Sequence, residues 1–196
     1  MKEINYLDGA RPQVKESIEE TFASYYSKIY ASKTTRTSND SRELLADIRL
    51  PRLEKHDTDL LEADLTVEEL EQAIHGLKSG KALGPNGMPV ELYKAQSERV
   101  APYLLQVFYR SRQNGILPSD QRLATIVVIH QEGKLRDDCV GYRPISLLNA
   151  EVKILAKLLA TRLLKVIMKL VHADQSGFMP KRSMALNLCR LYAVLG

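Results

Sequence analysis

The sequence of 196 residues lacks several features that define specialised classes of protein. It has no tryptophan and only two widely separated cysteines, Cys139 and Cys189, which excludes a disulfide-rich scaffold. No apolar run approaches the ~18 residues that a membrane-spanning helix needs. Residues 1–5 lack the basic and apolar regions of a secretory signal. We therefore expect an intracellular protein without a membrane segment, in the nucleus or the cytoplasm.

Histidine is also scarce, and its distribution argues against a zinc site. None of the four histidines has a cysteine or histidine partner at the spacing of zinc ligands. These residues are His56, His75, His130 and His172. We expect neither a metal site nor a cofactor in this chain.

Basic residues are unevenly distributed along the sequence. Residues 1–75 contain 10 Lys and Arg against 16 Asp and Glu, whereas residues 76–196 contain 18 against 8. A basic second half favours contact with an anionic polymer such as nucleic acid. The alternative is an ordinary solvated surface.

The N-terminal part predicts one helix followed by a linker. Apolar residues recur at helical spacing from Val14 to Ile29, which predicts an amphipathic helix over residues 11–30. Residues 32–47 are rich in Ser, Thr and charge, as linkers are. We expect two parts: residues 1–53 with this helix and polar linker, and residues 54–196 as the main domain.

A short helix and a tight turn follow. Thr66 and Glu69 have the spacing of a capping box, which predicts a helix that continues to Leu77. Residues 78–87 contain three glycines and a proline together with two lysines. Two interpretations stay open for this segment: a turn joining two helices, or backbone amides that bind phosphate. The turn residues are Gly84, Pro85, Asn86 and Gly87.

Residues 124–129 form a run of β-prone residues that ends before a charged segment. This pattern predicts a buried strand and a hairpin. Pro144 restricts Arg143 to an extended backbone, so its guanidinium is expected to project from the returning strand. A planar guanidinium in that position suits phosphate oxygens.

Residues 152–172 are expected to form one basic helix. They contain five cations and no carboxylate, and like charges four residues apart cost roughly 0.2–0.5 kcal/mol per pair. An anionic partner would relieve that cost, and the alternative is a solubilising face. The expected apolar face comprises Val152, Leu155, Leu159, Leu163 and Ile167, and the cations are Lys153, Lys157, Arg162, Lys165 and Lys169.

Three blocks, residues 124–149, 153–163 and 175–183, resemble the reverse transcriptase of non-LTR retrotransposons of the long interspersed element type. They include Gly141-Tyr142-Arg143-Pro144-Ile145-Ser146-Leu147-Leu148-Asn149 and Gln175-Ser176-Gly177-Phe178. The resemblance implies an α+β, mostly helical domain like the fingers of these enzymes, with a short β-hairpin and without the catalytic palm. The resemblance also implies that Arg143, Lys134, Gln175, Gly177, Phe178 and Arg182 bind nucleotide phosphate or nucleic acid. The charge pattern of residues 152–172 adds Lys153, Lys157, Arg162, Lys165 and Lys169 to these expected binding residues.

The sequence departs from the family pattern at several positions. Asn86 stands in place of the aspartate of the family's Gly-Pro-Asp-Gly signature, and Leu83 in place of a proline. Gln131 replaces a lysine that the resemblance would put near the phosphates of an incoming nucleotide, and Lys181 replaces a glycine. The lost lysine weakens the prediction of a tight nucleotide site.

Polymerisation by two metal ions needs carboxylates that hold the ions, which in full-length family members are magnesium. None of the carboxylates after residue 75 lies in the context of the family's aspartate motifs. We therefore expect a truncated, non-catalytic fragment that binds RNA or an RNA/DNA hybrid through backbone charge. The alternatives are a helical protein-interaction fragment and an unstable gene remnant without a selected role.

A fingers module that lacks its palm should expose apolar surface and self-associate. The residues expected on that surface are Leu147, Leu148, Leu155 and Leu191.

Overall fold

A computed structural model describes residues 18–31 and 51–195. The described residues form two compact units. Residues 18–31 and 124–147 make up the first, here the hairpin unit, and residues 51–123 and 148–195 make up the second, here the helical unit. This division differs from the predicted boundary at residue 53, because residues 124–147 pack with the N-terminal helix.

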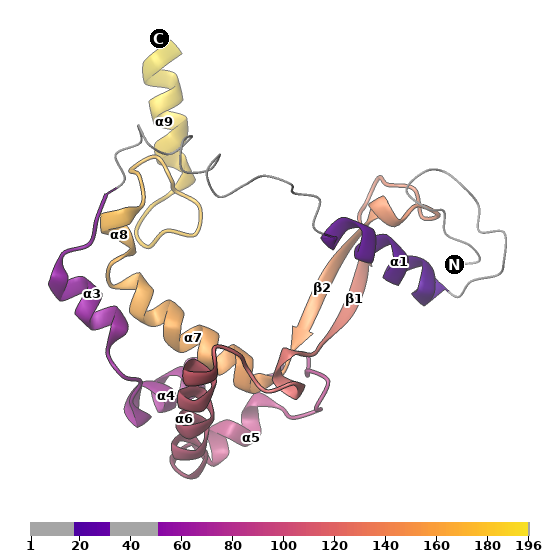
Figure 1. Cartoon of the computed structure of the whole chain (residues 1–196). Helices are drawn as coiled ribbons and strands as arrows, with labels where there is room; N and C mark the ends of the chain where they lie inside the picture. Colours follow the sequence, from indigo (N-terminus) through magenta and orange to yellow (C-terminus); the bar gives the residue numbers. More distant parts are fainter. Residues whose placement is uncertain (1–17, 32–50, 196) are drawn as a thin grey trace. The chain divides into compact units, whose positions relative to one another are not determined.

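The hairpin unit combines one helix with a two-stranded sheet (Figure 1). Helix α1 (Ile18–Tyr30) confirms the described part of the predicted amphipathic helix, whereas residues 11–17 and the predicted linker 32–47 lie outside the described residues. Strands β1 (Ala124–His130) and β2 (Tyr142–Leu148) form the predicted hairpin. The buried core of this unit is Phe22, Tyr25, Tyr26, Cys139 and Tyr142.

The prediction that β1 is buried is wrong. Ile126 and Ile129 are each 51% exposed, and Val127 is 42% exposed. An apolar run of this length predicts a buried strand. Within the described part of the hairpin unit, however, only α1 is available to cover a two-stranded sheet, so the β-branched residues reflect strand propensity.

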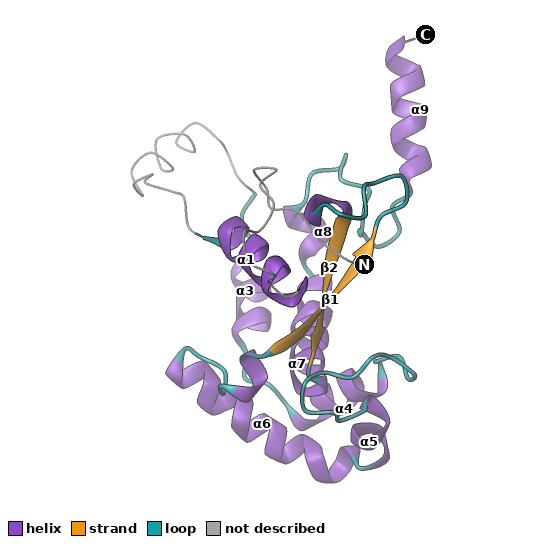
Figure 2. Cartoon of the chain, turned by 90° about the vertical axis from the view of Figure 1, so that its right-hand side faces the viewer, coloured by secondary structure: helices purple, strands orange, loops and turns teal. Residues whose placement is uncertain are grey.

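The helical unit is built from α3 (Lys55–Glu62), α4 (Val67–His75), α5 (Val90–Ala95), α6 (Ser97–Asn114), α7 (Ala150–Leu164), α8 (Ile167–Leu170) and α9 (Met184–Leu195). Helix α4 packs against α5, α6 and α7, as Figures 1 and 2 show. Its apolar face, with Leu70 and Ile74 fully buried, forms the core with Phe108 of α6 and Ile154 of α7. The predicted helix after Thr66 is therefore confirmed.

The prediction of one basic helix over residues 152–172 is wrong in extent and in orientation. Helix α7 ends at Leu164, and α8 is a separate short helix. The buried face of α7 consists of Ala150, Ile154, Leu158 and Arg162. By contrast, Leu159 and Leu163 of the predicted apolar face are 48% and 43% exposed. Two apolar stripes compete on this helix, and the buried one carries an arginine whose partners lie on distant segments.

The fold class is thus α+β and mostly helical, with an antiparallel hairpin, as predicted. Within the described residues, no helix has the length and apolar character needed to cross a membrane.

Candidate nucleic-acid interface

Arg143 lies near the start of β2 in the hairpin unit, as Pro144 predicts, and its side chain is exposed. It lines a hollow of about 540 Å³ whose other walls come from both strands of the hairpin. These lining residues are Ile129, His130, Gln131, Glu132, Pro144 and Ile145. Among the described residues, its guanidinium has no hydrogen bond or ion pair. An unpaired guanidinium in a partly polar hollow has the donors that a phosphate requires.

Gln131 stabilises the turn between the two strands through hydrogen bonds to backbone carbonyls. The Gln131 amide donates to the Gly141 carbonyl at 2.8 Å, and the Gln131 side chain donates to the Val140 carbonyl at 3.5 Å. A Cβ on Gly141 would contact the Leu135 carbonyl, so this approach requires glycine. Lys134 is exposed, and its carbonyl lies 3.0 Å from the His130 ring nitrogen Nε2. Gln131 therefore stabilises the turn, and Lys134 leaves its ammonium in solvent.

The turn Gly84, Pro85, Asn86 and Gly87 packs on the start of α7. A Cβ on Gly84 would lie 2.5 Å from the backbone nitrogen of Asn149, a residue that is 1% exposed. The Asn149 side chain accepts a hydrogen bond from the Asn86 amide at 3.1 Å and donates one to the Asp120 carbonyl at 3.0 Å. These contacts support the structural interpretation of the turn.

Glu151 explains why an amide at position 86 suits this chain. Its carboxylate accepts hydrogen bonds from the Asn86 side chain at 3.1 and 3.3 Å and from the Tyr93 hydroxyl at 2.5 Å. Burial and then the bond to Glu151 raise the pKa of Tyr93, so its hydroxyl stays protonated and donates. An aspartate at position 86 would place a second carboxylate against Glu151.

The five predicted cations of residues 152–172 have different environments. Lys153 donates to the Ala82 carbonyl at 3.0 Å, while Lys157 and Lys165 are exposed. Lys169 pairs with Asp57 at 2.7 Å, and the Asp57 side chain is only 7% exposed. The hydrogen bond from Lys169 lowers the pKa of Asp57, so this carboxylate is ionised. The Lys169 ammonium is therefore already paired with a carboxylate, although its side chain is 54% exposed.

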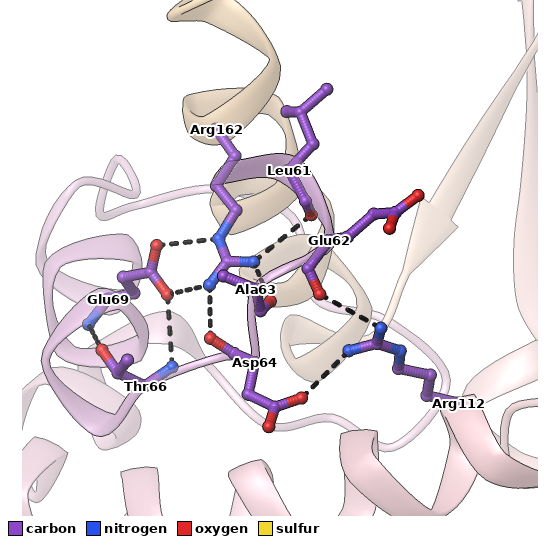
Figure 3. Close-up of polar contacts among 8 residues, drawn as sticks. All are labelled: Leu61, Glu62, Ala63, Asp64, Thr66, Glu69, Arg112 and Arg162. Carbon is purple, nitrogen blue, oxygen red and sulfur yellow. Dashed lines mark hydrogen bonds and ion pairs between the residues drawn. The ribbon is translucent and has the colours of Figure 1, made fainter. Parts of the chain in front are cut away.

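Arg162 is buried and holds the segment that joins α3 to α4 (Figure 3). Its guanidinium donates to both carboxylate oxygens of Glu69, at 2.8 and 2.6 Å. It also donates to the carbonyls of Leu61, Ala63 and Asp64. Arg162 is therefore not available to a phosphate as predicted, because its donors are engaged and its side chain is only 6% exposed.

Glu69 serves two structures at once. Its backbone amide donates to the Thr66 hydroxyl, and its carboxylate accepts from the Thr66 amide, which completes the capping box of α4. The hydrogen bond from Arg162 lowers the pKa of the same carboxylate. Nearby, Arg112 donates to the Glu62 carbonyl and pairs with the exposed Asp64 at 3.3 Å (Figure 3).

The segment Gln175-Ser176-Gly177-Phe178 forms a loop that is stabilised by hydrogen bonds from Gln175 and Arg182 to backbone carbonyls. Gln175 donates to the Gly177 carbonyl at 3.1 Å, and Arg182 donates to the carbonyls of His172 and Gln175 at 2.6 and 2.8 Å. Phe178 is fully exposed. Lys181 has a φ of 59°, the left-handed backbone that favours glycine, which accounts for the usual glycine of the resembled pattern.

The structure brings together a set of lysines that the sequence did not single out as one site. Residues 76–82, here the lysine loop, contain Lys78 and Lys81 and are contacted by Lys94, Lys153 and Lys157. The glycine-rich composition of this loop was the available signal, but the three outer lysines come from α5 and α7. Within the described ranges 18–31 and 51–195, no group of three His, Cys, Asp or Glu residues lies together as metal ligands would.

Proteins similar to this chain come from transposable elements. It is 29% identical over 92% of its length to the transposon TX1 uncharacterized 149 kDa protein of Xenopus laevis, of which it covers 14%. Over 65% of its length it is 30% identical to the probable RNA-directed DNA polymerase from transposon BS of Drosophila melanogaster, again covering 14%. The RNA-directed DNA polymerase from mobile element jockey of the same species is 31% identical over 58% of the chain, which covers 13% of it.

These relatives confirm the resemblance to non-LTR retrotransposon polymerases. The chain spans about one seventh of the length of these two curated relatives, the TX1 protein and the transposon BS polymerase. No model of a known protein family matches the chain.

Proposed function

We propose that this chain, a relative of retrotransposon RNA-directed DNA polymerases, binds the phosphate backbone of RNA or an RNA/DNA hybrid. The observation that carries the proposal is the exposed Arg143, which has no partner among the described residues and lines the hollow of the hairpin unit. Arg112, by contrast, is exposed but donates to the Glu62 carbonyl and pairs with Asp64. Arg143 therefore has donors to offer a ligand.

The ligand that fits is a phosphate group. A planar guanidinium can donate two parallel hydrogen bonds to phosphate oxygens. Lys134 belongs to the same unit and adds a positive charge that neutralises the backbone without reading its sequence. Contact of this kind is strongly weakened by salt, because binding releases counterions from the nucleic acid.

Binding of a short RNA/DNA hybrid by the whole chain tests the proposal. Arg143→Ala should weaken binding about tenfold at low salt, the effect of a lost charged hydrogen bond of about 1.4 kcal/mol. Arg110→Ala is the matched control, because Arg110 is an exposed arginine of α6 in the helical unit. It should change affinity less than about twofold. Equal losses in the two variants would overturn the role of Arg143.

We further propose that the chain is a fingers-like fragment that does not polymerise by itself. The support is the sequence context of its carboxylates, none of which matches the aspartate motifs that hold two metal ions in the resembled enzymes. The purified chain should give no primer extension on an RNA template with magnesium or manganese. Incorporation that depends on the purified protein and is lost in Arg143→Ala would contradict this proposal.

We also propose that the chain self-associates through exposed apolar residues, as expected for a fingers module without its palm. Leu191 of α9 is 52% exposed, and Leu188 and Tyr192 on the same helix are also exposed. Leu147, Leu148 and Leu155, predicted on the same surface, are half-buried. Sedimentation of the chain at increasing concentration checks this: a concentration-dependent rise in mass supports association, and a monodisperse monomer refutes it.

A further inference from the structure

The lysine loop concentrates positive charge in the helical unit, whereas Arg143 and Lys134, which carry the proposed function, belong to the hairpin unit. Lys78 and Lys81 lie within residues 76–82 and are exposed. The Lys94 amine donates to the Ser79 hydroxyl at 3.2 Å, and the Lys153 amine donates to the Ala82 carbonyl at 3.0 Å. The Lys157 side chain lies against Gly76 at the other end of the loop. Two lysines thus belong to one loop of seven residues, and the side chains of three more lie against it.

One carboxylate already occupies this loop. Glu91 accepts a hydrogen bond from the backbone amide of Gly80 at 2.6 Å. Gly80 has a φ of 69°, and a Cβ there would meet nothing within 4 Å, so the backbone is open on that side. The bond from Gly80 and the charge of Lys94 lower the pKa of Glu91, so the bound group is an anion. The backbone amide of Gly80 therefore already binds an anionic oxygen in this structure.

We propose that the lysine loop is a second binding site for a nucleic-acid phosphate, and that Glu91 competes with the phosphate for the Gly80 amide. The loop amide and the lysine ammoniums are the donors that surround phosphate in backbone contacts of nucleic-acid-binding proteins. Glu91 is exposed on the first turn of α5, so its side chain can leave the amide without unfolding the helix. A bound phosphate takes its place. This inference rests on the proposed function for the class of ligand only.

Glu91→Gln is the direct test, because it removes the negative charge and keeps the size of the side chain. It should tighten binding of a short RNA/DNA hybrid about fivefold at low salt, the effect of one unit charge at ~4 Å in water. Glu98→Gln is the matched control, since Glu98 is an exposed carboxylate of the next helix without a hydrogen bond to the loop. It should alter affinity less than about twofold.

The amide resonance of Gly80 in the whole chain separates the two proposals. When the hybrid is added, this resonance should shift in the wild type, and in Glu91→Gln it should shift at lower hybrid concentration. If Arg143→Ala weakens binding while the Gly80 resonance stays unchanged, the lysine loop is overturned and the proposed function stands. If Gly80 shifts but Arg143→Ala has no effect, the loop stands and the proposed role of Arg143 falls. If Glu91→Gln and Glu98→Gln have equal effects on affinity, the competition by Glu91 is refuted.

Discussion

The buried face of α7 and the lysine loop both carry cations, but the structure gives these cations opposite surroundings. On the buried face, Arg162 is 5% exposed and meets a carboxylate and three carbonyls. At the lysine loop, Lys78, Lys81 and Lys157 are exposed, and the Glu91 carboxylate accepts a hydrogen bond from the backbone amide of Gly80 rather than from a lysine. Arg162 stabilises the fold because its donors are engaged with protein acceptors, whereas the exposed lysines of the loop keep donors in solvent for a ligand.

The largest expected loss of stability comes from replacing the buried Arg162. Arg162→Met should lower the free energy of unfolding by about 3 kcal/mol, because it leaves Glu69 and the three carbonyls without their shared donor. Arg112→Ala is the control, since its pair with Asp64 is exposed and is worth less than about 1 kcal/mol. Denaturant unfolding measures both. Equal losses of unfolding free energy in the two variants would show that the buried Arg162 stabilises the fold no more than the exposed Arg112.

The partner carboxylate should give a smaller effect that depends on pH. Glu69→Gln should cost about 2 kcal/mol at pH 7, since a hydrogen bond between charged groups becomes one with a neutral amide. Arg162 lowers the pKa of Glu69 in the folded state, so the stabilisation is complete above the ordinary pKa of Glu, about 4.3. It is lost as the pH falls through the lowered pKa. The wild type and the variant should therefore converge at low pH, and a constant gap between them down to pH 2 would contradict this sign.

A still smaller effect is expected at the turn that packs on α7. Asn86→Asp should cost about 1 kcal/mol at neutral pH, because it replaces the hydrogen bond to Glu151 by repulsion between two carboxylates. Adding Glu151→Gln should recover most of the loss. The comparison of the two single variants with the double variant by thermal unfolding measures the coupling. Additive losses would show that Asn86 and Glu151 do not act as a pair.

Local features of the fold were predictable, and features that depend on distant partners were not. The capping box of Thr66 and Glu69 was predicted because both groups lie within one helical turn. The same Glu69 also binds Arg162, which is 93 residues away, and no sequence pattern linked the two. The predicted orientation of α7 was wrong for the same reason. Residue spacing alone could not show which of its two apolar stripes is buried.

The same difference between local and distant contacts decides which residues of the candidate site could be predicted. Pro144 was enough to place Arg143 on the returning strand, since the restriction acts on the neighbouring residue. Lys169 was predicted to meet phosphate and instead pairs with Asp57, 112 residues away. The lysine loop was missed as a cluster because Lys94, Lys153 and Lys157 reach it from α5 and α7.

The most direct test of the difference between cations paired with a carboxylate and the lysines of the loop is the salt dependence of hybrid binding in three forms of the chain. These are the wild type, the double variant Lys153→Gln and Lys157→Gln, and the single variant Lys169→Gln. If the outer lysines contact phosphate, the double variant should flatten the slope of log affinity against log salt by roughly 0.7 to 0.9 for each lost contact. Lys169→Gln should leave the slope unchanged, because its ammonium is already paired with Asp57. An unchanged slope in the double variant, or an equal flattening in Lys169→Gln, would contradict the account.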